Sequence, residues 1–223
     1  MASNELLNKA HPLKAMLALT IPSMFAQFVN ILYGVVDKLF IANMQSGSGL
    51  ALAGVGICAP ITTLITSFTY LICQGASPLF ATRLGQKDYD DAKKIMANSF
   101  LLLVIITVVL MLVFLIFKKP LLYSFGATPN NFEYASDYIT IYVLGTFFCL
   151  MSLGLNSFIT CQGKSTRAMV TVIIGALTNI LLDYIFIFPF NMGVKGAALA
   201  TIIAQAASAL FAFSFLISNK SII

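Results

Sequence analysis

Two aspartates, Asp37 and Asp183, stand within long apolar stretches of the sequence. A carboxylate near the centre of a bilayer costs about 2.5–3.5 kcal/mol on insertion scales, and such residues usually face a protein interior and serve a function. Helical spacing places other polar residues beside them. Gln27 and Asn30 share a helix face with Asp37, and Asn179 lies one turn before Asp183. Lipid-facing surfaces are not built in this way, so both faces are predicted to line a protein interior.

A third polar face, with Thr201 and Gln205, lies in the last apolar stretch. Carboxylate, amide and hydroxyl oxygens are hard ligands, which suit a proton or a small alkali cation such as Na⁺ rather than a soft metal. Two carboxylates in one low-dielectric cavity repel each other, so at least one is expected to hold a proton that it can exchange. These residues therefore predict reversible binding of H⁺ or Na⁺, and no cofactor or other metal is expected.

The depth of these residues in a bilayer provides a second argument. At a rise of about 1.5 Å per residue, Asp37, Asp183 and Thr201 each lie about 10 Å below the outer ends of their predicted helices. Tyr138 falls at a similar level. The residues predicted to share one cavity are Asp37, Asn179, Asp183, Thr201 and Tyr138. Asn156 follows Tyr138 by 18 residues, which is about 27 Å along a straight helix, so it is expected near the inner end.

The elements that position these residues are predicted to be membrane-spanning helices. Of the 223 residues, 59% are hydrophobic and 9% are charged, against roughly a quarter charged in an ordinary soluble domain. The sequence therefore predicts an all-α integral membrane protein in contact with the lipid bilayer, and no nucleic-acid partner. Six transmembrane helices are predicted in one membrane lobe of residues 1–223, at 13–43, 50–82, 92–117, 130–160, 167–190 and 195–218. Pro22 is predicted to bend the first helix, as a static kink or as a hinge.

Lysine and arginine residues predict the orientation of the helices. One side of the predicted membrane holds Lys9, Lys14, Arg83, Lys87, Lys93, Lys94, Lys164, Arg167 and Lys220. The opposite side holds Lys118, Lys119 and Lys195. Because cytoplasmic loops carry the excess of positive charge, both termini are predicted to be cytoplasmic, in a multi-pass protein of the plasma (inner) membrane.

Several segments occur in an order and spacing typical of one transporter family. They are Leu19–Pro22, Tyr33–Asp37, Ala51–Gly56, Arg83–Gly85, Phe125–Thr128, Asn179–Asp183 and Met192–Thr201. On these segments, over essentially its whole length, the chain resembles the multidrug and toxic compound extrusion (MATE) transporters. The resemblance implies two six-helix lobes, twelve helices in all, that export organic, often cationic compounds in exchange for H⁺ or Na⁺ by alternating access. It also implies a cation site at Asp37, Asn179, Asp183 and Thr201, with Tyr138 and Asn156 associated.

Two features depart from that family. Thr160 stands where many relatives carry an arginine, and a second six-helix lobe is missing. The chain is therefore expected to be a fragment of a longer protein or to work as a homodimer. The alternative within transport is a lipid-linked oligosaccharide flippase, which is expected to need a cationic cavity. A structural or assembly subunit without transport of its own would leave the two aspartates without a reason. No enzyme is expected, because no metal-binding set and no Ser/His pair occurs at membrane depth.

Overall fold

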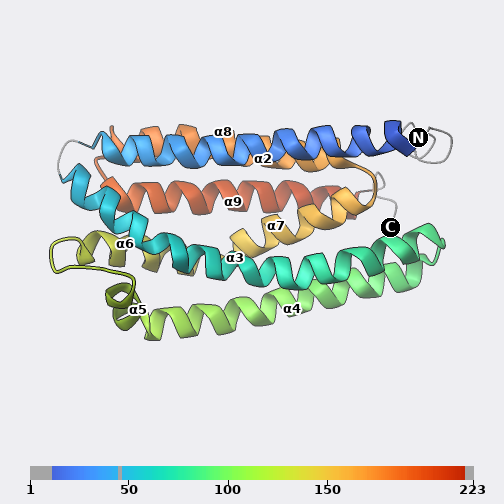
Figure 1. Cartoon of the computed structure of the whole chain (residues 1–223), viewed down its shortest axis with the longest axis horizontal. Helices are drawn as coiled ribbons and strands as arrows, with labels where there is room; N and C mark the ends of the chain where they lie inside the picture. The colour runs from blue at the N-terminus through green and yellow to red at the C-terminus, as the bar shows by residue number, and fades with distance from the viewer. Residues whose placement is uncertain (1–11, 45–46, 219–223) are drawn as a thin grey trace.

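The computed structural model describes residues 12–44 and 47–218, and the regular elements among them are α-helices. The long helices are α2 (Pro12–Ala42), α3 (Ser48–Gly85), α4 (Tyr89–Ile116), α8 (Ser165–Ile187) and α9 (Gly193–Ile217). The shorter helices are α5 (Lys118–Ser124), α6 (Phe132–Leu144) and α7 (Thr146–Cys161). The long helices lie roughly along one axis and form an elongated bundle (Figure 1).

The connections between helices gather at the two ends of this bundle (Figure 1). One end, called the inner end here, holds the start of α2, the end of α9, and the α3–α4 and α7–α8 turns. The other, outer end holds the α2–α3 connection, α5 and the α8–α9 turn. The first and last described residues therefore lie at the same end. Lys9 and Lys220, two of the residues from which the orientation was predicted, lie outside the described residues.

Five helices among the described residues are long and apolar enough to cross a membrane, namely α2, α3, α4, α8 and α9. The predicted helix 130–160 is instead a pair, α6 and α7, bent by 55° at Gly145. Taken as one span, this pair is the sixth. A Cβ atom at Gly145 would clash with Ile202 of α9, so the bend lies where α9 approaches the backbone closely. The prediction of a single straight helix was wrong here, and α5 was not predicted.

The packing of α8 against α9 depends on small residues. A side chain at Gly175 would clash with Ser208 Oγ, which itself donates a 3.1 Å hydrogen bond to the Thr171 carbonyl. Small residues let membrane helices approach closely enough for such contacts. The contact fixes α8 between α9 and α2, and so fixes the face that carries Asn179 and Asp183.

Helix α2 contributes little to the interior. It packs chiefly along α8, and its buried residues are Asp37 and Ile41. Most of its apolar side chains, among them Phe25, Phe28 and Ile31, are exposed on the bundle surface. In a bilayer such a surface meets lipid or another helix bundle, because the described chain covers it with nothing else.

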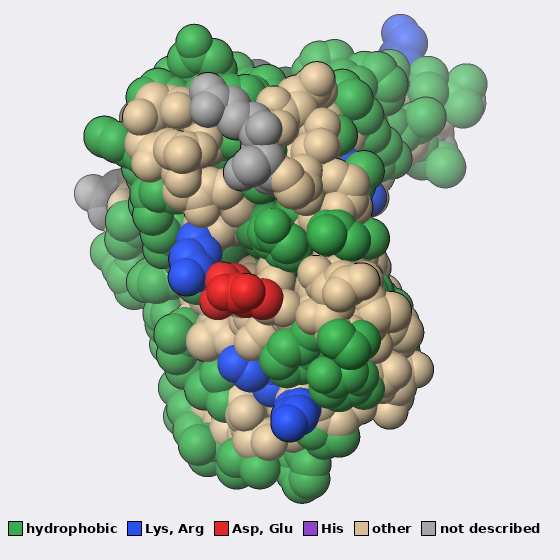
Figure 2. Space-filling model, turned by 90° about the vertical axis from the view of Figure 1, so that its left-hand side faces the viewer, with side chains coloured by type: hydrophobic (Ala, Val, Ile, Leu, Met, Phe, Trp, Pro, Cys, Tyr) green, Lys and Arg blue, Asp and Glu red, His purple; other side chains and the backbone are tan. Residues whose placement is uncertain are grey.

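The outer end carries few charged side chains, and basic and acidic groups lie close together there (Figure 2). One pair joins two helices: Lys195 Nζ at the start of α9 lies 3.3 Å from Asp137 Oδ2 on α6. Lys118 Nζ donates a 2.9 Å hydrogen bond to Thr140 Oγ1 on α6. These contacts tie the ends of α5 and α9 to α6 at the predicted membrane surface.

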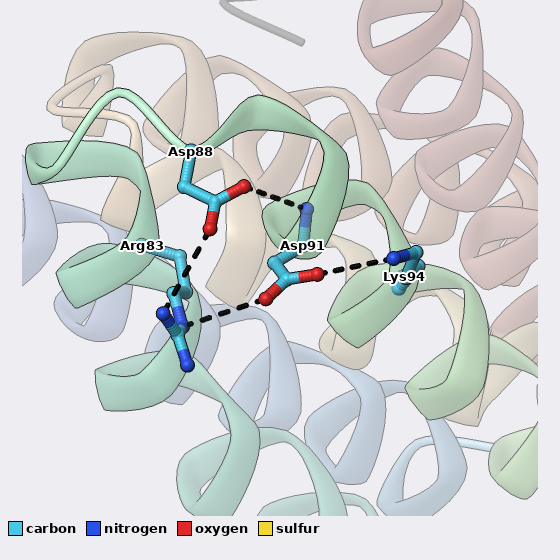
Figure 3. Close-up of polar contacts among 4 residues, drawn as sticks. All are labelled: Arg83, Asp88, Asp91 and Lys94. Atoms are coloured by element: carbon cyan, nitrogen blue, oxygen red, sulfur yellow. Dashed lines mark hydrogen bonds and ion pairs between the residues drawn. The ribbon is translucent and has the colours of Figure 1, made fainter.

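The inner end has a larger charged cluster at the α3–α4 turn (Figure 3). Asp88 caps α4 by accepting a 3.2 Å hydrogen bond from the Asp91 backbone N–H. Arg83 reaches from the last turn of α3 to Asp88 and Asp91, at 3.8 and 3.9 Å, and Lys94 Nζ lies 3.1 Å from Asp91 Oδ1. The cluster fixes the turn that joins the two antiparallel helices.

Candidate functional site

A polar cavity of about 330 Å³ lies within the bundle, between α2, α3, α7, α8 and α9. Its walls carry amides and hydroxyls, and no charged side chain of the described residues lines it. The polar residues that line it are Ser23, Gln27, Asn30, Tyr33, Tyr70, Gln74, Ser77, Ser152, Asn156, Ser157, Thr160, Ser165, Asn179, Thr201, Gln205 and Ser208. Such a surface can hold water or the polar parts of an organic molecule.

Six of the predicted site residues lie on this wall: Gln27, Asn30, Asn156, Asn179, Thr201 and Gln205. Two of their contacts are defined by the fold. Thr201 Oγ1 donates a 3.0 Å hydrogen bond to the Ala197 carbonyl, one turn back on α9. Gln205 Nε2 donates a long, 3.5 Å hydrogen bond to Tyr33 Oη and so links α9 to α2 across the cavity.

Asp37, Asp183 and Tyr138 do not line this cavity, whereas Asn179 and Thr201 do; that the five residues form one cation site stays a prediction. The three side chains are buried, with exposed fractions of 8%, 0% and 7%. Helix packing explains the difference. Because α2 lies along α8, the faces that carry the two aspartates are covered. Asn179 is also buried, with an exposed fraction of 1%, but it belongs to the cavity lining.

The buried aspartates nevertheless form one electrostatic unit. Asp37 lies close enough to Asp183 for their negative charges to repel each other. Both carboxylates also interact electrostatically with the hydroxyl group of Tyr138. Asp37 also acts on Tyr33, whose ring lines the cavity. Both oxygens of Asp183, Oδ1 of Asp37 and both amide atoms of Asn179 have no hydrogen-bond partner among the described residues.

Buried polar atoms without partners are costly, and native proteins rarely leave them so. Here five such atoms are concentrated around two carboxylates. A proton or a small alkali cation would supply the missing contact and reduce the repulsion between the carboxylates. The donor set consists of hard oxygen ligands, which fits both ions. Among the described residues no group of three His, Cys, Asp or Glu side chains could hold a metal ion.

Asn156 lies toward the inner end of α7, five residues before the helix ends at Cys161. It nevertheless lines the same cavity as Asn179. Pro22 lies inside α2, which continues as a helix on both sides of it. Whether Pro22 acts as a hinge stays a prediction.

Several cavity residues were missed, chiefly Tyr70, Gln74 and Ser77 on α3 and Ser152 on α7. Their spacing carried a usable signal. Tyr70, Gln74 and Ser77 are four and three residues apart, and Ser152 precedes Asn156 by four, which places each set on one helix face. They form the same kind of polar stripe as Gln27 and Asn30, without an aspartate to draw attention to it.

Membrane-length helices around an uncharged cavity, with a buried carboxylate pair beside it, are an arrangement typical of membrane transporters. The family comparison agrees with this class. The model of the MatE family matches residues 22–185, and the chain therefore belongs to the MatE family, that of the multidrug and toxic compound extrusion transporters.

Individual relatives lead to the same family. The multidrug export protein MepA of Staphylococcus aureus is 26% identical over 215 residues, which are 96% of this chain and 47% of MepA. A crystal structure of a MATE protein in a bent conformation is 29% identical, with a TM-score of 0.89 over 99% of this chain and 48% of that one. A transporter of Pyrococcus furiosus described as having a binding pocket of reverse polarity is also 29% identical, with a TM-score of 0.88 over 96% of this chain and 47% of that one. The chain spans about half the length of the relatives it matches.

Proposed function

We propose that this chain is one half of a secondary antiporter that exports organic, often cationic compounds in exchange for H⁺ or Na⁺ by alternating access. The observation that carries the proposal is the buried pair Asp37 and Asp183 beside the cavity, where both Asp183 oxygens and Asp37 Oδ1 have no hydrogen-bond partner among the described residues. Family membership adds support, since the relative MepA is named a multidrug export protein.

In this proposal the carboxylate pair is the coupling site. When H⁺ or Na⁺ is bound, the repulsion between Asp37 and Asp183 is reduced and the packing of α2 on α8 is favoured. When the ion leaves, two negative charges remain in a low-dielectric interior, which favours separation of the helices or entry of water. Asn179 lies between this pair and the cavity, and Thr201 offers a further hydroxyl oxygen on the cavity wall.

The proposal extends to the parts that the chain does not contain. A second six-helix lobe, in the same polypeptide or from a second copy, would complete the route across the membrane, because the chain spans about half the length of its relatives. The exposed apolar face of α2 is available for lipid or for that lobe. We place the protein in the plasma (inner) membrane, with the inner end of the bundle in the cytoplasm.

The flippase alternative is less well supported. A pyrophosphate-linked lipid carries several negative charges and needs Lys or Arg in its path, yet within the part of the chain described no such side chain lines the cavity. A purely structural subunit would have no use for two buried aspartates, three of whose oxygens lack a hydrogen-bond partner among the described residues. Neither alternative is favoured by a specific contact.

Transport by the reconstituted full-length protein tests the proposal. In proteoliposomes, an imposed pH or Na⁺ gradient should drive accumulation of a fluorescent organic cation against its own gradient, and dissipating the ion gradient should stop it. Residues 1–223 alone should give no drug resistance in cells, and joining a second six-helix lobe should restore it. Resistance from residues 1–223 alone, with a crosslinked dimer, would favour the homodimer. Transport that ignores both ion gradients would contradict the proposal.

A further inference from the structure

The polar cavity extends far beyond the carboxylates, toward the inner end of the bundle. On α8 its lining runs from Asn179 back to Ser165, the first residue of the helix. These residues are 14 positions apart, about 21 Å along a helix. We call the inner part of the cavity the inner limb, and its lining residues are Ser77, Asn156, Thr160, Cys161 and Ser165.

Three buried polar atoms of the inner limb have no hydrogen-bond partner among the described residues, Ser77 Oγ, Asn156 Oδ1 and Ser165 Oγ. The Ser165 side chain is 98% buried, with an exposed fraction of 2%. Nearly all such atoms in native proteins are satisfied by protein or by ordered water. All three residues belong to the lining of the cavity, so the cavity is the nearest source of a partner for these buried atoms.

Neighbouring hydroxyls in the same region differ, because the backbone already satisfies them. Thr160 Oγ1 donates a 3.0 Å hydrogen bond to the Asn156 carbonyl. Ser157 Oγ, which also lines the cavity, donates a 3.3 Å hydrogen bond to the Leu153 carbonyl. Asn156 and Ser165 therefore differ from Thr160 and Ser157 in that each has a buried polar atom that the backbone does not satisfy.

The inner limb is also uncharged, since its lining residues carry hydroxyl, amide and thiol groups. A carboxylate here would hold a cation, and a Lys or Arg would repel it. Neutral oxygens instead replace part of a hydration shell and let the ion leave again. The limb thus has the chemistry of a passage rather than that of a binding site.

We propose that the inner limb is the path by which the coupling ion leaves Asp37 and Asp183 for the inner end, with Asn156 and Ser165 as hydration sites along it. The inference rests on the proposed ion-coupled export. A proton released from a carboxyl group passes to water in the limb, and Na⁺ exchanges carboxylate oxygens for water, amide and hydroxyl oxygens. The whole path lies within this six-helix half.

The experiment compares Ser165→Ala, Asn156→Leu and their double variant in the full-length protein. Ser157→Ala is the matched control, because its hydroxyl lines the same cavity but is already bonded to the backbone. The first measurement is substrate-driven ion movement in proteoliposomes, followed with a pH-sensitive or Na⁺-sensitive dye. The second is modification of the Cys161 thiol by a charged methanethiosulfonate added at the inner side. Cys161 lines the limb, whereas Cys58, Cys73 and Cys149 are buried.

Each single variant should slow ion movement by roughly threefold to tenfold, since a higher barrier lowers a rate exponentially, and the double variant should slow it further. Cys161 modification should slow in the double variant, and affinity for the organic substrate should not change. If the variants match Ser157→Ala in ion movement and in Cys161 modification, and the protein exports normally, the proposed path is overturned while the proposed function stands. If the variants lose affinity for the substrate and ion movement is not slower, the inner limb binds the substrate, and the proposed ion path is overturned as well. Absence of ion-coupled export in the unmodified protein would overturn the proposed function and the path together.

Discussion

Asn179 reaches the wall of the polar cavity, while Asp183, one turn further along α8, is fully buried behind it. A helical turn advances about 5.4 Å, so the carboxylate lies close to the cavity without being part of its surface. Asn179 is thus the residue of the cavity lining that stands one turn from Asp183. Its buried amide has no hydrogen-bond partner among the described residues, so in the proposed coupling site it can contact a bound ion.

The carboxylate pair predicts non-additive substitutions. Asp37→Asn and Asp183→Asn should each abolish ion-driven export by the full-length protein, and the double variant should be no worse, because the two groups act as one site. Rates of export in proteoliposomes measure this. Membrane insertion should survive, since neutral Asn is cheaper to bury than a carboxylate. A well-expressed Asp183→Asn variant that still transports against a gradient would place the coupling site elsewhere.

Close packing of α3 on α6 predicts a sharp difference between two glycines. A Cβ at Gly54 would lie 3.0 Å from the Ala135 backbone nitrogen and 3.1 Å from the Asn131 carbonyl oxygen, whereas Gly56 has nothing within 4 Å. Gly54→Ala should cost about 1–3 kcal/mol through overpacking. Gly56→Ala should gain about 0.5–1 kcal/mol through reduced backbone entropy.

Thermal unfolding of the full-length protein in detergent tests this pair. The apparent Tm should fall for Gly54→Ala and stay equal or rise for Gly56→Ala. Both substitutions add the same methyl group to the same helix two residues apart, so propensity cannot explain a difference. Equal shifts would contradict the contact between α3 and α6.

In the inner charged cluster (Figure 3), we predict that the Asp88 cap of α4 contributes more to stability than the exposed ion pair of Lys94 does. Asp88→Ala removes the cap of α4 together with the 3.8 Å contact to Arg83, and loss of the cap should cost about 0.5–2 kcal/mol. Lys94→Ala removes one exposed pair, and such pairs contribute about 0–1 kcal/mol. The apparent Tm should therefore fall more for Asp88→Ala. A loss at Lys94 as large as that at Asp88, abolished by high salt, would show that the ion pairs dominate.

The predicted orientation is tested by labelling in intact cells. In a background with Cys161→Ser, where the remaining cysteines Cys58, Cys73 and Cys149 are buried, a cysteine introduced at Ser48 should react with an impermeant thiol reagent, and one introduced at Lys87 should react after the membrane is opened. The two positions lie at opposite ends of the bundle, at the start of α3 and just after its end. The reverse pattern would invert the membrane orientation and reverse the direction of the proposed path.

Composition and periodicity were enough to predict the helical membrane fold, because apolar runs of membrane length have few alternatives. The α6–α7 bend could not be predicted, since Gly145 looks ordinary until Ile202 of α9 is placed against it. The polar stripes predicted Asn179 and Thr201 on the cavity. They did not show that the packing of α2 on α8 covers Asp37 and Asp183, because tertiary packing decides which helix lies against a given helix face.

Helix α2 contributes few buried residues to the interior, which has a consequence for how this protein can evolve. Asp37 sits on a helix with two buried residues, whereas Asp183 sits on α8, which is packed against both α2 and α9. Substitutions along α2 should therefore alter ion or drug preference before they harm folding. Substitutions along α8 should lower the amount of protein made in the cell. Variants selected for new drug resistance are expected to accumulate on α2, where adaptation is least constrained by stability.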